Sequence, residues 1–193
     1  MVGLSDRDVS SEVIESCRRG DRDAFRTLFE AYKDRVYSIA LYFFHGDRAA
    51  ASDATQQVFL KLITGIGQFR GDAGFSTWLY RLVVNTCMDG ARQRKWRAAE
   101  LSALGPEALA EPGVQHAQFA RAQMASSVQV AVSSLPAQFR FAILLRYFED
   151  LSYEEMAKVL NCSMGTVASR LSRGHRILAG KLAPLRSWFT TRE

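Results

Sequence analysis

The sequence predicts an all-α protein of two small helical domains joined by a flexible acidic linker, the second domain holding a helix-turn-helix. Apolar residues recur at spacings of three and four along most of the 193 residues, which is the period of a helix with one buried face. The period of two that half-buried strands require is absent. Two of the four prolines fall in one segment, residues 98–118, which divides the chain.

Residues 1–97 are predicted to form the first domain, with three main helices. The first apolar face is made of Phe25, Leu28, Phe29, Tyr32, Val36, Ile39, Ala40 and Phe43. The second is made of Ala50, Ala54, Val58, Phe59, Leu62 and Ile66. Four glycines between residues 65 and 74 then break the pattern, and a third helix starts near Ser76 and runs to a basic cluster at 92–97. It turns Phe75, Leu79, Leu82 and Val83 inward.

Residues 98–118 are predicted to be the linker. They contain Glu100, Glu107 and Glu111, two prolines and two glycines, and no Lys or Arg. Such a composition is typical of a tether between domains. The alternative is a surface loop inside one domain, but loops of this length without structure are uncommon in compact domains.

Residues 119–193 are predicted to form the second domain. A weakly marked helix spans 119–134, and Pro136 suits the first turn of the next one, because its missing N–H would have no partner there. The apolar set of that helix is Phe139, Ile143, Leu144, Tyr147 and Phe148.

The stretch from residue 151 to 178 has the pattern of a helix-turn-helix. Ser152 and Glu155 form a capping box that opens a short helix, and Ser163 caps a longer one. The inward residues are Met156, Ala157, Leu160, Val167, Leu171 and Leu178.

Charge indicates what this helix pair contacts. Between Glu155 and Glu193 there are seven Lys or Arg and no acid, within a chain of net charge +5. The outward side chains are Thr166, Ser169, Arg170 and Arg173, and hydroxyl and guanidinium groups suit a recognition helix in the major groove of DNA. An ordinary αα-hairpin with a solvated basic face is the alternative, although capping, spacing and charge sign together favour DNA binding.

Other classes of protein are disfavoured. His45, His116 and His175 have no Cys or acid at ligand spacing, Cys17, Cys87 and Cys162 form no CxxC, and we expect no metal, cofactor or catalysis. The N-terminus lacks the apolar core of a signal peptide, and no apolar run approaches the roughly 20 residues of a membrane helix, so we expect a cytoplasmic protein. A free-standing helix-turn-helix regulator that binds duplex DNA alone remains the main alternative.

Three stretches carry a family resemblance. "LSYEEMAKVLNCSMGTVASRLSRGHRIL" resembles the C-terminal domain of bacterial RNA polymerase sigma factors of the extracytoplasmic-function (ECF) group, in the sigma-70 family. "FRGDAGFSTWLYRLVVNTCMDGARQRK" is similar to their promoter-melting part, and "DATQQVFLKLI" to their core-binding helix. The resemblance covers residues 11–182 in family order. It implies a factor that binds core polymerase, directs it to promoters and helps to open the DNA.

The resemblance also implies roles for residues. For the upstream (−35) promoter element they are Ser163, Thr166, Ser169, Arg170 and Arg173. For the downstream (−10) element and melting they are Phe69, Arg70, Trp78, Arg81, Asn85, Arg92, Arg94 and Lys95, the loop of residues 68–74 holding an unstacked base. For core polymerase they are Asp53, Gln56, Gln57, Leu60 and Lys61. Without the family resemblance, Trp78 would be interpreted as a core residue and the loop of residues 68–74 as a plain interhelical turn. The residues assigned to core polymerase would be interpreted as a solvated polar face.

Implied partners are core RNA polymerase, through the β′ clamp helices and the β flap, promoter DNA and an anti-sigma factor. Many relatives carry Glu at the position of Gln57, and often Glu and Lys at those of Met164 and Ala168. Met164 cannot accept a hydrogen bond from a cytosine amino group as a carboxylate could, so the sequence of the −35 element is not assigned.

Overall fold

The computed structural model describes residues 9–71, 74–102 and 121–183. Within these ranges the chain forms eight α-helices and one short 3-10 helix, and no strand. The predicted all-α fold with a C-terminal helix-turn-helix is therefore confirmed. The greater part of the predicted linker, residues 103–118, lies outside the described residues.

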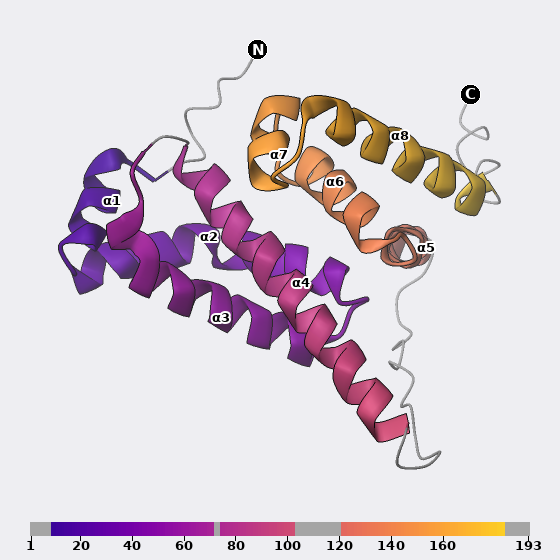
Figure 1. Ribbon diagram of the computed structural model, residues 1–193, viewed down its shortest axis with the longest axis horizontal. Coiled ribbons are helices and arrows are strands. Elements are labelled where there is room, and N and C mark those ends of the chain that lie inside the picture. The colour runs from indigo at the N-terminus through magenta and orange to yellow at the C-terminus, as the bar shows by residue number, and fades with distance from the viewer. Residues whose placement is uncertain (1–8, 72–73, 103–120, 184–193) are drawn as a thin grey trace.

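The N-terminal unit is a bundle in which α4 crosses the pair formed by α2 and α3 (Figure 1). Its elements are α1 (Ser11–Arg18), α2 (Arg22–Phe43), α3 (Arg48–Gly65), the 3-10 helix η2 (Ile66–Gln68) and α4 (Phe75–Ser102). Side chains of Ser10, Asp21 and Asp47 cap the first three helices by accepting hydrogen bonds from backbone N–H groups of the first turn. These caps fix where each helix starts.

The core of this unit follows the predicted periodicity. The fully buried side chains include Leu28, Tyr32, Val36, Ile39, Val58, Leu62 and Leu79. Phe29 departs from the prediction, because 41% of it is exposed. The third helix also differs: α4 continues to Ser102, so residues 98–102, assigned to the linker, are helical.

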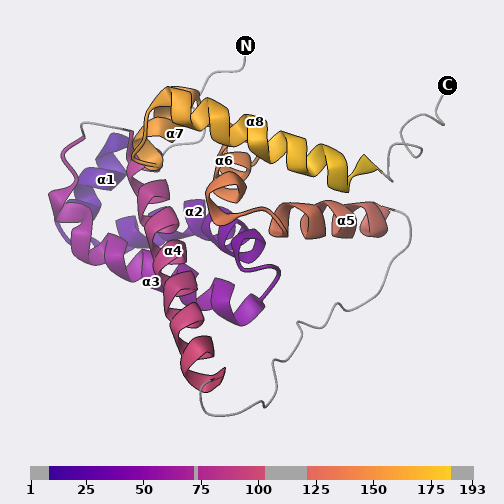
Figure 2. The same cartoon turned by 45° about the vertical axis from the view of Figure 1, so that its right-hand side comes forward.

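The C-terminal unit consists of four helices, with α7 and α8 crossing over α6 (Figure 2). Their bounds are α5 (Arg121–Ser133), α6 (Ala137–Tyr147), α7 (Tyr153–Val159) and α8 (Met164–Lys181). Pro136 is the N-cap of α6, one residue before the predicted place. Asn161, in the turn between α7 and α8, has φ 47°, a conformation that Asn tolerates better than most residues.

Capping and burial in the helix-turn-helix match the prediction closely. Both hydrogen bonds of the Ser152–Glu155 capping box are present, and the Ser163 hydroxyl accepts from the N–H of Thr166. Gly174 lets α8 approach α6, since a Cβ there would lie 3.2 Å from the Ile143 side chain. Tyr147, expected to face inward, is 59% exposed.

The two units are packed against each other, α2 on α6 and α4 on α7 (Figures 1 and 2). The rings of Phe43 and Phe141 stack with centroids 4.5 Å apart, and those of Tyr42 and Phe148 meet edge to face at 4.7 Å. Each pair joins residues about 100 positions apart, so no local pattern predicts it.

Arg140 of α6 is the charged residue at the centre of this contact, and only 5% of it is exposed. Its guanidinium group donates to the backbone carbonyls of Phe43, Ser133 and Leu135, and it lies 3.3 Å from the His45 ring nitrogen. Burial lowers the pKa of Arg140 to about 10, and burial together with Arg140 lowers the pKa of His45. The side chain therefore links the two units through carbonyl groups of both.

Candidate nucleic-acid interface and apolar groove

Helix α8 presents a polar outer face opposite its buried Val167 and Leu171. Ser169 and Arg173 are exposed there, as predicted. Arg170 is half-buried and donates to the Cys162 sulfur at 3.6 Å. Of these three side chains, Ser169 and Arg173 are therefore the more open to solvent.

Ser163 and Thr166 occupy the first turn of the same helix. Their hydroxyl groups share a hydrogen bond of 2.9 Å, and Ser163 also accepts from the N–H of Thr166. Both hydroxyls are thus held in place by capping, which leaves their remaining hydrogen-bonding capacity at the N-terminus of α8. A helix N-terminus favours phosphate.

Side chains in the N-terminal half of α4 contact both the loop after η2 and the second domain. Trp78 is half-buried and packs on Phe69 and Phe75, with ring centroids 5.5 and 5.7 Å apart. Arg81, one turn on, donates to the carbonyl of Lys158 in α7 at 2.8 Å, while Asn85 is exposed. Trp78 and Arg81 are therefore already engaged within the molecule.

Tyr80 makes a second contact across the units, because its hydroxyl donates to the Glu149 carboxylate. Burial first, and then the negative charge of Glu149, raise the pKa of Tyr80 above its usual range. The phenol therefore stays protonated and acts as the donor to Glu149.

Two arginines in the C-terminal half of α4 are ion-paired. Arg92 pairs with Asp89 three residues earlier, and Arg94 pairs with Asp47 at 2.9 Å. Asp47 has a lowered pKa because it accepts from the N–H of Ala50, with Arg94 adding to the effect. Lys95 is exposed. The Arg94–Asp47 pair was not predicted, because 47 residues separate the two side chains in sequence, whereas Asp89 stands only three residues before Arg92.

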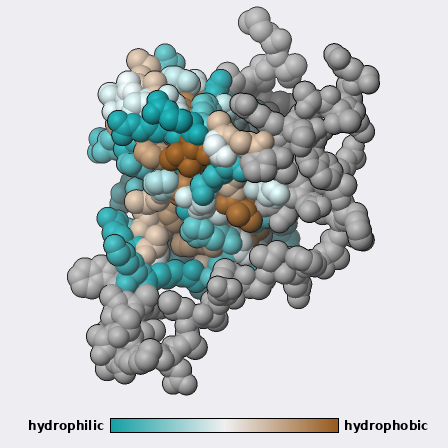
Figure 3. Space-filling view, turned by 90° about the vertical axis from the view of Figure 1, so that its right-hand side faces the viewer, coloured by the Kyte–Doolittle hydropathy of each residue, from teal (hydrophilic) through white to brown (hydrophobic). Residues whose placement is uncertain are grey.

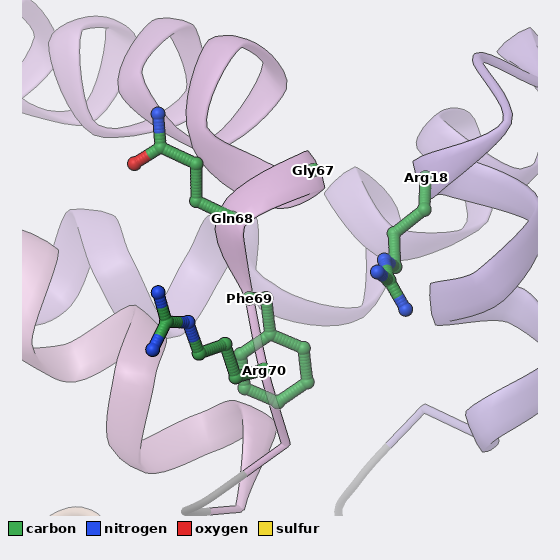
Figure 4. A pocket seen from close by; sticks show the side chains of 5 residues that line it. All are labelled: Arg18, Gly67, Gln68, Phe69 and Arg70. Carbon is green, nitrogen blue, oxygen red and sulfur yellow. The ribbon is translucent and has the colours of Figure 1, made fainter.

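The loop after η2 borders a cavity of about 680 Å³. Its lining, shown in Figure 4, is Arg18, Gly67, Gln68, Phe69 and Arg70. Phe69 and Arg70 were expected here, but Arg18, which comes from α1, was not. Gly71 has φ 77°, a backbone conformation that favours glycine.

An apolar groove of about 480 Å³ lies between α2 and α3. It is lined by Phe29, Tyr37, Ser52, Thr55, Gln56, Phe59, Leu60 and Ile63. Leu60 and Ile63 are each about half exposed, at 50% and 51%. Exposed apolar side chains gathered in a groove mark an interaction site.

The predicted core-binding residues divide between two sides of α3. Gln56 and Leu60 line the groove. Lys61 instead donates to the Thr86 hydroxyl of α4 at 3.1 Å, and the exposed Asp53 and Gln57 precede it at spacings of four on the same face. Gln56 and Leu60 therefore lie on the side of α3 that faces α2, and Lys61 lies on the side that faces α4.

Figure 3 shows the side of the molecule on which α5 lies, where hydrophobic residues form separate spots among hydrophilic ones. The described part of α5 exposes Val128 and Val130, at 38% and 61%. Scattered exposure of this kind is ordinary for a protein surface.

Among the described residues, no group of three or more His, Cys, Asp or Glu is placed to hold a metal ion. Over the same ranges, no helix has both the length and the apolar character to cross a membrane. Cys17 and Cys87 are buried, and burial raises the pKa of the Cys87 thiol to about 12, so it is unreactive as a nucleophile.

A helix-turn-helix unit packed on a helical bundle with a basic fourth helix is an arrangement typical of DNA-binding proteins. The chain belongs to the sigma-70 family of RNA polymerase sigma factors, within the ECF group. Residues 28–97 match the family model for sigma-70 region 2, and residues 126–178 match that for sigma-70 region 4. It is accordingly a transcription initiation factor.

Two curated relatives support this assignment over nearly the whole chain. The RNA polymerase sigma-H factor of Pseudomonas aeruginosa is 33% identical over 187 residues, covering 93% of this chain and 96% of the relative. The ECF RNA polymerase sigma-E factor of Escherichia coli K12 is 32% identical over 191 residues, covering 94% of this chain and 98% of the relative.

Solved structures share the fold. CnrH in complex with the cytosolic domain of CnrY has a TM-score of 0.67 at 20% identity, covering 93% of this chain and 97% of that one. The sigma factor RpoE in complex with the anti-sigma factor NepR from Bartonella quintana also has a TM-score of 0.67, at 22% identity. This match covers 82% of this chain and 96% of that one.

Proposed function

We propose that this sigma factor binds core RNA polymerase through the α2–α3 groove, contacts the −35 element with α8, and holds melted DNA at the loop after η2. The observation that carries the proposal is that three chemically different surfaces occur on the two sigma modules of one chain. We also propose two domains, residues 1–97 and 119–193, with the end of α4, residues 98–102, leading into the linker between them. A cytoplasmic location and an action without catalysis of its own belong to the same proposal.

The α2–α3 groove suits a helix of the polymerase, the β′ clamp in particular. An amphipathic helix docks by placing apolar side chains into such a groove, and Leu60 and Ile63 are available to pack against it. Gln56 at the rim supplies hydrogen bonds that fix orientation. Asp53, Gln57 and Lys61 extend the polar border of this surface toward α4.

The loop after η2 suits an unstacked base. Phe69 offers a ring for stacking, and Trp78 and Phe75 pack behind it and hold it in place. Removing a base from the stack costs a few kcal/mol, and stacking on an aromatic ring returns about 1–3 kcal/mol. Arg70 beside the ring, with Asn85, Arg92, Arg94 and Lys95 along α4, contacts the adjoining backbone and duplex.

Helix α8 suits the major groove of the −35 element. Arg173 and Ser169 project from its outer face, while Ser163 and Thr166 stand at its N-terminus, where phosphate is favoured. Arg170 reaches DNA after leaving the Cys162 sulfur, a weak acceptor.

An anti-sigma factor is the proposed regulatory partner. Two structures with this fold, CnrH and RpoE, are solved in complexes, with CnrY and with the anti-sigma factor NepR. For this chain, a partner that covers the α2–α3 groove would compete directly with core polymerase.

Transcription with purified components tests the proposed function. Core polymerase alone and core with this protein are given a fragmented genomic library, and transcript 5′ ends are mapped. We expect transcripts that need the protein and share two upstream sequence elements. Absence of such transcripts would overturn the proposal, and a footprint on duplex DNA without core would favour the free-standing regulator.

A further inference from the structure

We propose that Arg18 of α1 binds the backbone phosphate of the unstacked nucleotide that enters the cavity after η2. The inference rests on the proposed function of that loop and adds a contact from a helix outside it. The ligand is one nucleotide of single-stranded DNA, with its base on the Phe69 side of the cavity and its phosphate on the Arg18 side.

Arg18 lines the cavity from α1, on the side opposite the loop. In Figure 4 its guanidinium group lies across open space from the Phe69 ring, whereas the side chains of Gln68 and Arg70 extend to the other side of the loop. The cavity of about 680 Å³ falls within the size range of small-molecule sites. Arg18 thus brings positive charge to the cavity from α1, in addition to Arg70 of the loop.

Arg18 can exchange its present partner, because that ion pair is exposed to solvent. Among the described residues, Arg18 pairs with Glu15, three residues earlier, at 2.9 Å. The two side chains are 41% and 53% exposed, and an ion pair as open as this is weak and separates at small cost. A phosphate can therefore replace the Glu15 carboxylate, and Arg18 offers it a bidentate contact.

Arg19 provides a matched comparison in the same turn. It is also exposed and also bonds three residues back, to the Ser16 hydroxyl at 3.0 Å, but it does not line the cavity. A general effect of positive charge on DNA affinity would appear equally at both arginines, whereas a site contact would appear only at Arg18.

Holoenzyme binding to a labelled single strand tests the inference. The probe is an oligonucleotide with the non-template sequence of the −10 element found by transcript mapping, followed by fluorescence anisotropy at several salt concentrations. We expect Arg18→Ala to weaken binding about 3- to 10-fold and to reduce the salt slope by about 0.7, the value for one phosphate contact on a single strand. Arg19→Ala should bind as the wild type does.

Neutral methylphosphonate linkages, placed one at a time in the probe, locate the contact. One linkage should weaken wild-type binding and have no further effect on Arg18→Ala. Equal salt slopes for Arg18→Ala and wild type, or additive losses at every linkage, would overturn the role of Arg18 while the probe still binds. A wild-type holoenzyme that does not bind the probe would instead count against the proposed function of the loop, and the inference would fall with it.

Discussion

The guanidinium group of Arg81 donates a hydrogen bond to the backbone carbonyl of Lys158, across 2.8 Å and 77 residues of sequence. Arg81 belongs to the helix proposed to meet the −10 element, and Lys158 belongs to the helix-turn-helix. In this closed arrangement of the two units, α7 therefore covers the part of α4 at which we propose that promoter DNA binds.

We predict that this arrangement opens when core polymerase binds, because the contact between Arg81 and Lys158 covers a face of α4 that we propose for the −10 element. Energy transfer between dyes on the exposed Asp34 and Ser172, attached through unnatural amino acids, should be high in the free protein and fall when core binds. Unchanged transfer in the holoenzyme would contradict this prediction.

Replacing Arg140 should destabilise the protein. Arg140→Met leaves buried carbonyl acceptors of Phe43, Ser133 and Leu135 without a donor, and we expect a loss of about 2–4 kcal/mol in the free energy of unfolding. Urea unfolding measures it. Arg176→Met, at an exposed site on α8, is the control and should change stability by less than about 0.5 kcal/mol. Equal stability of the two variants would show that the buried guanidinium adds nothing.

Acidic substitutions in the α2–α3 groove should weaken core binding without unfolding the chain. Leu60→Glu and Ile63→Glu place a charge where an apolar contact is proposed, and we expect at least about a tenfold rise in Kd for core polymerase. Val130→Glu, at an exposed valine of α5, is the matched control. The Kd is measured by fluorescence anisotropy of labelled protein. A comparable rise in Kd for all three variants would show that core polymerase binds elsewhere.

The two arginines of α8 should contribute unequally to promoter binding. Arg173→Ala should reduce affinity for the −35 duplex and lower the salt slope by about 0.9, because Arg173 is exposed on the outer face of α8. Arg170→Ala should have a smaller effect on the slope, since Arg170 is half-buried against Cys162. Footprints and salt slopes of holoenzyme on duplex promoters measure both, and a slope unchanged by Arg173→Ala would exclude that phosphate contact.

The features that the sequence predicted correctly are local ones. Helix positions follow from spacings of three and four, and the caps at Ser152 and Ser163 depend on residues only three positions away. The helix-turn-helix and the exposed side chains of Ser169 and Arg173 could be found for the same reason.

What only the tertiary structure decided involves residues far apart in the chain. Arg140 reads as an ordinary surface arginine, yet packing buries it between the two units. Arg94 forms an ion pair with Asp47, and Arg18 of α1 lines the cavity beside Phe69. A helical period states which face of each helix is apolar, but which helices meet, and therefore which charges are paired, depends on how all the faces pack at once.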